Sequence, residues 1–95
     1  MAIQSFNDTD TQDFWSERRI PRKFQSFAAQ AARRLNILNA ASDLNDLRNL
    51  ASNHFEALRG NPPGRYSIRI NQKNRVVFKW SDNGPCDVKV EIDYH

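Results

Sequence analysis

Arginine and lysine side chains gather between Glu56 and Trp80, where six basic residues accompany a single acidic one. The chain then ends on Asp93-Tyr94-His95, three side chains that can donate or accept protons. An arginine fork matches two oxygens of a phosphate and keeps its charge at any ordinary pH. These residue types suit cleavage of RNA, because the ribose 2′-hydroxyl already lies beside the phosphate and no metal or cofactor is required.

A plainer interpretation of the same residues stays open. Basic residues on strand faces often serve only solubility, and the whole chain carries a formal charge of just +3. A C-terminal His95 is typically solvated, and Tyr94 continues the apolar alternation of Val88, Val90 and Ile92, which is typical of a core residue. Tyr94 reaches a site if the twist at the end of the strand turns its side chain toward a cleft rim.

Length and composition exclude several classes of protein. The 95 residues have room for one domain, residues 1–95, and no apolar run approaches the roughly 18 residues that span a bilayer. The N-terminus is too polar for a signal peptide and the single Cys86 makes no internal disulfide, so we expect the cytoplasm. We expect no metal, because a zinc site would need Cys86, both histidines and a carboxylate to converge, and no phosphate-loop or cofactor motif is present.

The first half of the chain shows helical periodicity. Thr9 and Gln12 have the spacing of a capping box and predict the start of a short helix. Ser42 is a candidate N-cap for a later short helix. Between them, residues 21–39 predict the longest helix, because apolar residues recur there at helical spacing: Phe24, Phe27, Ala28, Ala31, Leu35 and Leu38.

After about residue 53 the period changes from roughly 3.6 to roughly 2 residues, which predicts strands. Three alternating segments, joined by turn sequences, predict an antiparallel meander near residues 66–70, 76–80 and 88–92. Shorter extended segments are expected at residues 2–6 and 55–58.

The fold class that follows is α+β, with N-terminal helices packed on one face of a small twisted antiparallel sheet. The other face of the sheet then carries Arg69, Arg75 and Lys79. We expect His54 to be a loop residue, and Trp15 and Trp80 to pack against the core rather than stack on bases.

Four segments of the sequence resemble the HigB-like toxins of the RelE/ParE superfamily of bacterial toxin–antitoxin systems, also described as plasmid-maintenance killer proteins. The most specific segments are the run Tyr-Ser-Ile-Arg-Ile-Asn and the terminal Asp-Tyr-His, whereas the helical half adds little. The resemblance extends over nearly the whole chain, and its segments are 58–60 (LRG), 64–71 (GRYSIRIN), 74–80 (NRVVFKW) and 90–95 (VEIDYH).

The resemblance implies a toxin that enters the ribosomal A site and cleaves mRNA during translation, as a metal-independent endoribonuclease that inhibits growth. It also implies neutralisation by a helix-turn-helix, HigA-like antitoxin encoded beside it. The toxin–antitoxin complex would repress its own operon, so operator DNA is contacted only through that complex. Ribosome and mRNA are the other expected partners, and no membrane is involved.

The resemblance also assigns site residues. Its catalytic positions fall on Arg59, Arg75 and Tyr94, with Asp93 and His95 flanking the tyrosine. Arg75 would hold the scissile phosphate, Arg59 would assist from a facing segment or the leaving-group side, and Tyr94 would move protons with Asp93 or His95. The expected RNA-binding residues are Arg65, Arg69, Asn71, Lys73 and Lys79.

One position departs from the pattern and keeps two alternatives open. A second arginine of some relatives falls on Asn71, and Arg69, two residues earlier on the same strand face, can take its place. A non-catalytic RNA-binding module or a weak toxin remnant is therefore one alternative. The other is a ParE-like poison of DNA gyrase with the same fold, although such proteins generally lack the set formed by Arg59, Arg75 and Tyr94.

Overall fold

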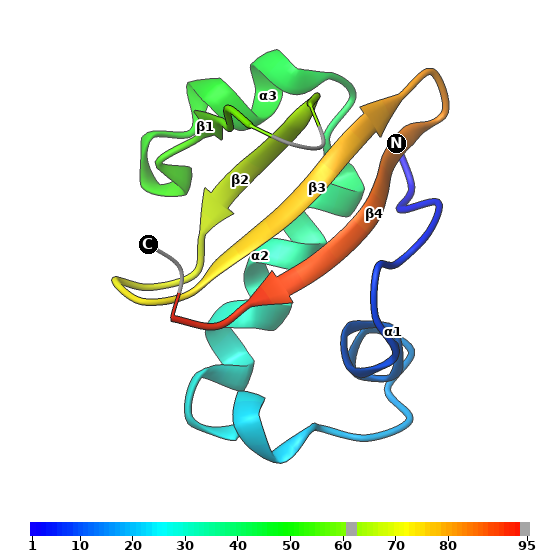
Figure 1. The fold of residues 1–95 in the computed structure, drawn as a ribbon, viewed down its shortest axis with the longest axis vertical. Helices are drawn as coiled ribbons and strands as arrows, with labels where there is room; N and C mark the ends of the chain where they lie inside the picture. Colours follow the sequence, from blue (N-terminus) through cyan, green and yellow to red (C-terminus); the bar gives the residue numbers. More distant parts are fainter. Residues whose placement is uncertain (61–62, 94–95) are drawn as a thin grey trace.

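The computed structural model describes residues 1–60 and 63–93. The helical elements come first, and a four-stranded antiparallel sheet of order β1-β2-β3-β4 follows (Figure 1). The helical elements are α1 (Thr9–Trp15), the 3₁₀ helix η1 (Arg22–Phe27), α2 (Ala28–Ala40), α3 (Leu44–Asn49) and the 3₁₀ helix η2 (Ala51–Asn53). The strands are β1 (Glu56–Ala57), β2 (Arg65–Arg69), β3 (Arg75–Ser81) and β4 (Gly84–Glu91). The predicted α+β class and the antiparallel meander are confirmed.

The core lies between the helices and one face of the sheet. Figure 1 shows α2 running behind β2, β3 and β4, with α1 beside β4. Leu35 and Leu38 of α2 and Ile68 and Phe78 of the sheet are fully buried in one apolar cluster. Because side chains alternate along a strand, the residues between these core positions must point to the opposite, helix-free face.

The N-caps of α1 and α3 each lie one residue away from the cap that the sequence predicted. Asp8, not the Thr9 capping box, is the N-cap of α1, and its carboxylate accepts from the N–H of Thr11 at 2.9 Å. Asp43, not Ser42, caps α3 by accepting from the N–H of Asp46 at 3.0 Å. Both predictions were wrong because adjacent Asp, Ser and Thr residues are all good caps, and only the backbone angles decide between them.

The predicted long helix over residues 21–39 is two helices in the structure. Its first part, η1, is a 3₁₀ helix, and α2 continues from Ala28. A 3₁₀ helix has about three residues per turn, so Phe24 and Phe27 lie on the same side, and both are buried. The apolar stripe is therefore preserved although the helix type changes.

The N-terminal segment lies along the outer edge of β4. Phe6 forms a parallel bridge with Val88, and the N–H of Gln4 donates to the carbonyl of Pro85 at 2.8 Å. Residues 2–6 are therefore extended, as expected, but among them only Phe6 forms a β-bridge. Farther along β4, Thr11 of α1 accepts from the N–H of Val90 at 3.0 Å. These contacts occupy hydrogen-bonding groups that an edge strand would otherwise expose.

The described helices are all too short or too polar to cross a lipid bilayer.

Candidate functional site

The helix-free face of the sheet presents side chains from β2, β3 and β4 in cross-strand rows. The register pairs Arg69 with Arg75 and Arg75 with Glu91, and we call this set the Arg75 row. At the other end of the face, Arg65 pairs with Lys79, and Asp87 lies beside Lys79; this set is the Arg65 row. The middle row is Ser67, Val77 and Lys89. The prediction that Arg69, Arg75 and Lys79 share the face opposite the helices is confirmed.

Arg75 is the most firmly held charged side chain of this face, and only 8% of it is exposed. Its Nε donates to the hydroxyl of Ser67 at 2.7 Å, and its Nη2 donates to the carbonyl oxygens of Ser67 and His54. Each of these three contacts is to a neutral oxygen, and together they fix the direction of the guanidinium. A positive group held in this way costs little reorganisation when negative charge develops nearby.

His54 belongs to this site, although the sequence predicted only a loop residue. Its carbonyl accepts from Arg75, and its ring Nε2 lies 3.5 Å from Nη1 of Arg69. The residue is in the left-handed region, with φ 44°, where it ends η2. The sequence carried no signal for this contact, because the group that binds Arg75 is a backbone carbonyl.

A buried amide network holds the segment that presents His54. Asn53 is fully buried, and its side chain donates to the carbonyl of Leu47 at 3.0 Å and accepts from Nη1 of Arg34 at 2.8 Å. Burial lowers the pKa of Arg34, and the neighbouring Arg33 lowers it further. The position of His54 therefore depends on α2 and α3 as well as on its own segment.

The turn between β2 and β3 brings more of the predicted residues to the Arg75 row. The side-chain oxygen of Asn71 accepts from the N–H groups of Lys73 and Asn74, each at 2.9 Å. The side-chain oxygen of Asn74 accepts from the N–H of Asp93 at 3.1 Å, so Asp93 lies at the same end of the face as Arg75. Lys73 and Asp93 are exposed there.

Asn71 thus has a structural task that an arginine could not perform. An arginine side chain has no hydrogen-bond acceptor, so it would leave the two turn N–H groups without their partner. This accounts physically for asparagine at the position where some relatives were expected to carry arginine. Arg69, in the Arg75 row, remains the candidate second arginine.

The structure separates Arg59 from Arg75. Arg59 is exposed after β1, where the N–H of Leu58 donates to the carbonyl of Arg65 at 2.8 Å. Arg59 therefore lies near the Arg65 row, and the Arg75 row is about 13 Å farther along β2 at about 3.3 Å per residue. The two arginines therefore lie toward opposite ends of the face, and the expected assistance of Arg59 to Arg75 stays a prediction.

Two predicted catalytic residues, Tyr94 and His95, lie outside the described residues. Trp15 and Trp80 are half-buried and pack against the core, as expected. Within residues 1–60 and 63–93, His, Cys, Asp and Glu side chains form no group of three or more that could hold a metal ion. The free Cys86 is half-buried near the start of β4.

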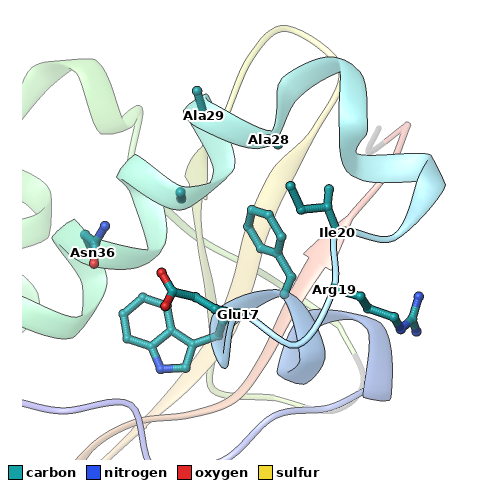
Figure 2. Close-up of a pocket in the computed structure, with 9 residues that line it drawn as sticks. Glu17, Arg19, Ile20, Ala28, Ala29 and Asn36 are labelled. Atoms are coloured by element: carbon teal, nitrogen blue, oxygen red, sulfur yellow. The ribbon is translucent and has the colours of Figure 1, made fainter.

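A pocket lies in the helical layer, away from the basic face. It has a volume of about 660 Å³ and lies between α1, the segment after it, and α2 (Figure 2). Phe14, Trp15 and Ile20 line it together with alanines of α2. Figure 2 shows Arg19 pointing away from the pocket, in keeping with its ion pairs to Asp10 and Asp13. Six of its nine lining residues are apolar, and its one cation, Arg19, is paired with carboxylates, so this pocket is poorly suited to bind a phosphate.

Known proteins match both the sequence and the fold. Residues 4–95 match the sequence model of a family described as RelE-like toxin of type II toxin-antitoxin system HigB. Toxin HigB-1 from Vibrio cholerae serotype O1 is 39% identical over 83 residues, which is 86% of this chain and 86% of that protein. The solved YoeB dimer from Staphylococcus aureus has a TM-score of 0.57 and 22% identity, covering 100% of this chain and 97% of that one. The YoeB/ParE toxin from Agrobacterium tumefaciens has a TM-score of 0.53 and 19% identity, covering 100% and 99%. At these identities the solved structures support the fold alone.

Proposed function

Because the chain belongs to the family of RelE-like toxins of type II toxin–antitoxin systems described as HigB, we propose that it is an endoribonuclease that cleaves mRNA on the translating ribosome. The observation that carries this proposal is the fixed guanidinium of Arg75 beside Arg69 at one end of an open basic face. Two adjacent arginines form a site for a phosphate group, and neither needs a metal ion to act.

In the proposed reaction, the ribose 2′-hydroxyl attacks the adjacent phosphorus and the bond to the 5′-oxygen of the next nucleotide breaks. Arg75 stabilises the extra negative charge that develops on the phosphate oxygens. Arg69, whose guanidinium lies beside the ring of His54, binds the same phosphate from the next strand. The products are a 2′,3′-cyclic phosphate and a free 5′-hydroxyl, so one proton leaves the 2′-oxygen and one reaches the leaving oxygen.

The proton transfers are assigned to the end of the chain. We place Asp93, Tyr94 and His95 in this role, because their side chains can accept and donate protons. The hydrogen bond from Asp93 to Asn74 supports the assignment, since Asn74 directly precedes Arg75. The ring of His54 is a further candidate for proton transfer, since it lies beside Arg69.

The proposed partners follow from the family. The toxin acts in the cytoplasm, where ribosomes and mRNA are found, and a helix-turn-helix antitoxin neutralises it. The complex of the two, rather than the toxin alone, binds operator DNA. A structural relative in Staphylococcus aureus has been solved as a YoeB-YefM complex, with a TM-score of 0.54 to this chain.

The test is a brief induction of the protein in bacterial cells, followed by primer extension on a reporter mRNA. Wild type is compared with Arg75→Ala and with Arg33→Ala, a matched loss of an exposed arginine on α2. We expect discrete cuts within the translated region for wild type and Arg33→Ala, and none for Arg75→Ala. Growth arrest without any cuts would refute the nuclease and point to another target, such as DNA gyrase.

A further inference from the structure

A small notch on the basic face extends from the Arg65 row along β4 to Glu91, the acidic member of the Arg75 row. It has a volume of about 150 Å³. A water molecule occupies about 30 Å³ in the liquid, so the notch has room for one phosphate group with some of its hydration. Its lining combines the Arg65 row with neighbouring residues of β3, β4 and the N-terminal segment: Asn7, Arg65, Val77, Lys79, Asp87, Lys89 and Glu91.

A β-bulge in β4 shapes this notch. The pairing between β3 and β4 shifts after Val77, so that Asp87 and Val88 together oppose Phe78. Asp87 has φ 50°, and its N–H donates to the hydroxyl of Ser5 at 2.9 Å. Bulges commonly redirect a side chain, and this one places the Asp87 carboxylate beside Lys79 on the open face.

The acidic residues of the notch neutralise its lysines only weakly. Lys79 lies 3.7 Å from Asp87, and Lys89 lies 3.2 Å from Glu91. All four side chains are more than one third exposed, and ion pairs of this kind are weak in water. A phosphate that offers several strong acceptor oxygens can therefore compete with both carboxylates for the lysines.

Arg65 stands out because one nitrogen of its guanidinium is buried without a hydrogen-bond partner among the described residues. Its Nε is inaccessible to water and has no hydrogen-bond partner within residues 1–60 and 63–93. It also lies directly across from Lys79 in the strand register, and like charges in such pairs repel each other. A bound anion between the two side chains would remove this repulsion.

We infer that this notch is a second phosphate subsite, in which Arg65 and Lys79 bind the backbone of the same RNA strand whose scissile phosphate lies at Arg75. The inference rests on the proposed function, because it names a further contact for the same substrate. The two rows are about 13 Å apart along β2, which is the length of about four stacked nucleotides at 3.4 Å each. The notch would thus fix the direction of the strand across the sheet without reading its sequence.

The test measures binding rather than cleavage, so that it stands apart from the nuclease assay. The probes are fluorescent oligouridylates of two and eight nucleotides, with 2′-O-methyl groups that block cleavage. Only the longer probe can contact both rows at once, so wild type should bind it much more tightly than the shorter one. Arg65→Gln should weaken binding of the longer probe about tenfold and reduce the salt dependence of log K by about one unit.

Two variants and one competitor complete the design. Lys79→Gln should reproduce the effect of Arg65→Gln, whereas Arg33→Gln on α2 should keep the affinity and the salt dependence of wild type. Thermal unfolding of each variant verifies that it is folded. The inference would be overturned if Arg65→Gln and Arg33→Gln lost the same amount of affinity for the longer probe, or if wild type bound the two probes with equal affinity. Displacement of the RNA probe by octaglutamate, together with unchanged RNA binding by Arg65→Gln, would also overturn it. That result would indicate that the face binds an acidic protein.

If Arg65→Gln loses the extra affinity for the longer probe while Arg75→Ala still cuts mRNA in cells, the subsite is supported and the proposed role of Arg75 is refuted. If mRNA is cut but Arg65→Gln binds like wild type, the nuclease stands and the subsite fails.

Discussion

At the scale of single residues, the candidate site depends on side chains that fix other groups as much as on those proposed to contact RNA. Ser67 and the carbonyl of His54 hold Arg75, and Asn71 holds the turn that leads to it. Residue type and strand alternation predicted that Arg75 and Arg69 share the helix-free face, whereas the catalytic role of Arg75 was implied by the resemblance to HigB-like toxins and stays a prediction. The sequence could not predict the role of His54, because that contact joins positions 21 residues apart through a backbone atom that every residue has.

Replacing Asn71 by arginine tests whether this residue serves the turn. Asn71→Arg removes the acceptor for the N–H groups of Lys73 and Asn74, and we expect a loss of about 1–3 kcal/mol in the free energy of unfolding. Urea titration of wild type and variant measures the loss. Asn71→Asp keeps the acceptor oxygen and should be less affected. A fully stable Asn71→Arg with increased nuclease activity would show that the turn tolerates the residue and that our explanation is wrong.

At the scale of elements, the helices and the N-terminal segment together cover β4 and one face of the sheet. Binary patterning was enough to predict that helices cover one face of the sheet, because the change of period near residue 53 separates helices from strands. It did not predict that the N-terminal segment lies along β4. The local details of the helices were predicted less well from the sequence. The 3₁₀ geometry of η1 and the caps at Asp8 and Asp43 depend on backbone angles that neighbouring residues of similar propensity do not reveal.

The contact between α1 and β4 can be tested with one nearly isosteric substitution. Thr11 is fully buried and its hydroxyl accepts from the N–H of Val90, so Thr11→Val leaves a buried donor without its partner. We expect a loss of about 1–3 kcal/mol in the free energy of unfolding, measured by urea titration. Hydrogen exchange at the amide of Val90 should become faster in the variant. Unchanged stability and unchanged exchange would show that α1 does not protect this edge.

A second inter-element contact predicts a pH dependence. The carboxylate of Asp10 in α1 bonds to Lys23 of η1 and to Arg19, and these hydrogen bonds lower the pKa of Asp10 below its ordinary value of 3.8. A carboxyl whose pKa is lowered by folding stabilises the folded state above the unfolded pKa, and this contribution is lost as the pH falls through the folded pKa. Asp10→Asn should therefore lower the Tm at neutral pH, and the difference from wild type should shrink below pH 3.8.

Thermal unfolding across a series of buffers checks this expectation, with Asp82→Asn, an exposed turn residue, as the control. A Tm difference for Asp10→Asn that stays constant through the acidic range would contradict the assigned ion pairs.

At the scale of the whole molecule, the two sides of the sheet differ in chemistry. The helical side buries the apolar core, whereas the open side concentrates arginines and lysines from three strands. Charge arranged in this way draws a polyanion to one face, and the association weakens as salt rises. The sequence showed that the basic block existed, but only the register showed that it divides into an Arg75 row and an Arg65 row.

The most direct test of the central claim uses a purified translation system and an end-labelled mRNA. Wild type is compared with Arg75→Lys, which keeps the charge but loses the fork that Ser67 and His54 hold. We predict cuts in codon register when ribosomes translate the message, little cutting of the same mRNA alone, and a rate about a hundredfold lower for Arg75→Lys. Cleavage that is equally fast without ribosomes, or that Arg75→Lys leaves unchanged, would contradict the account.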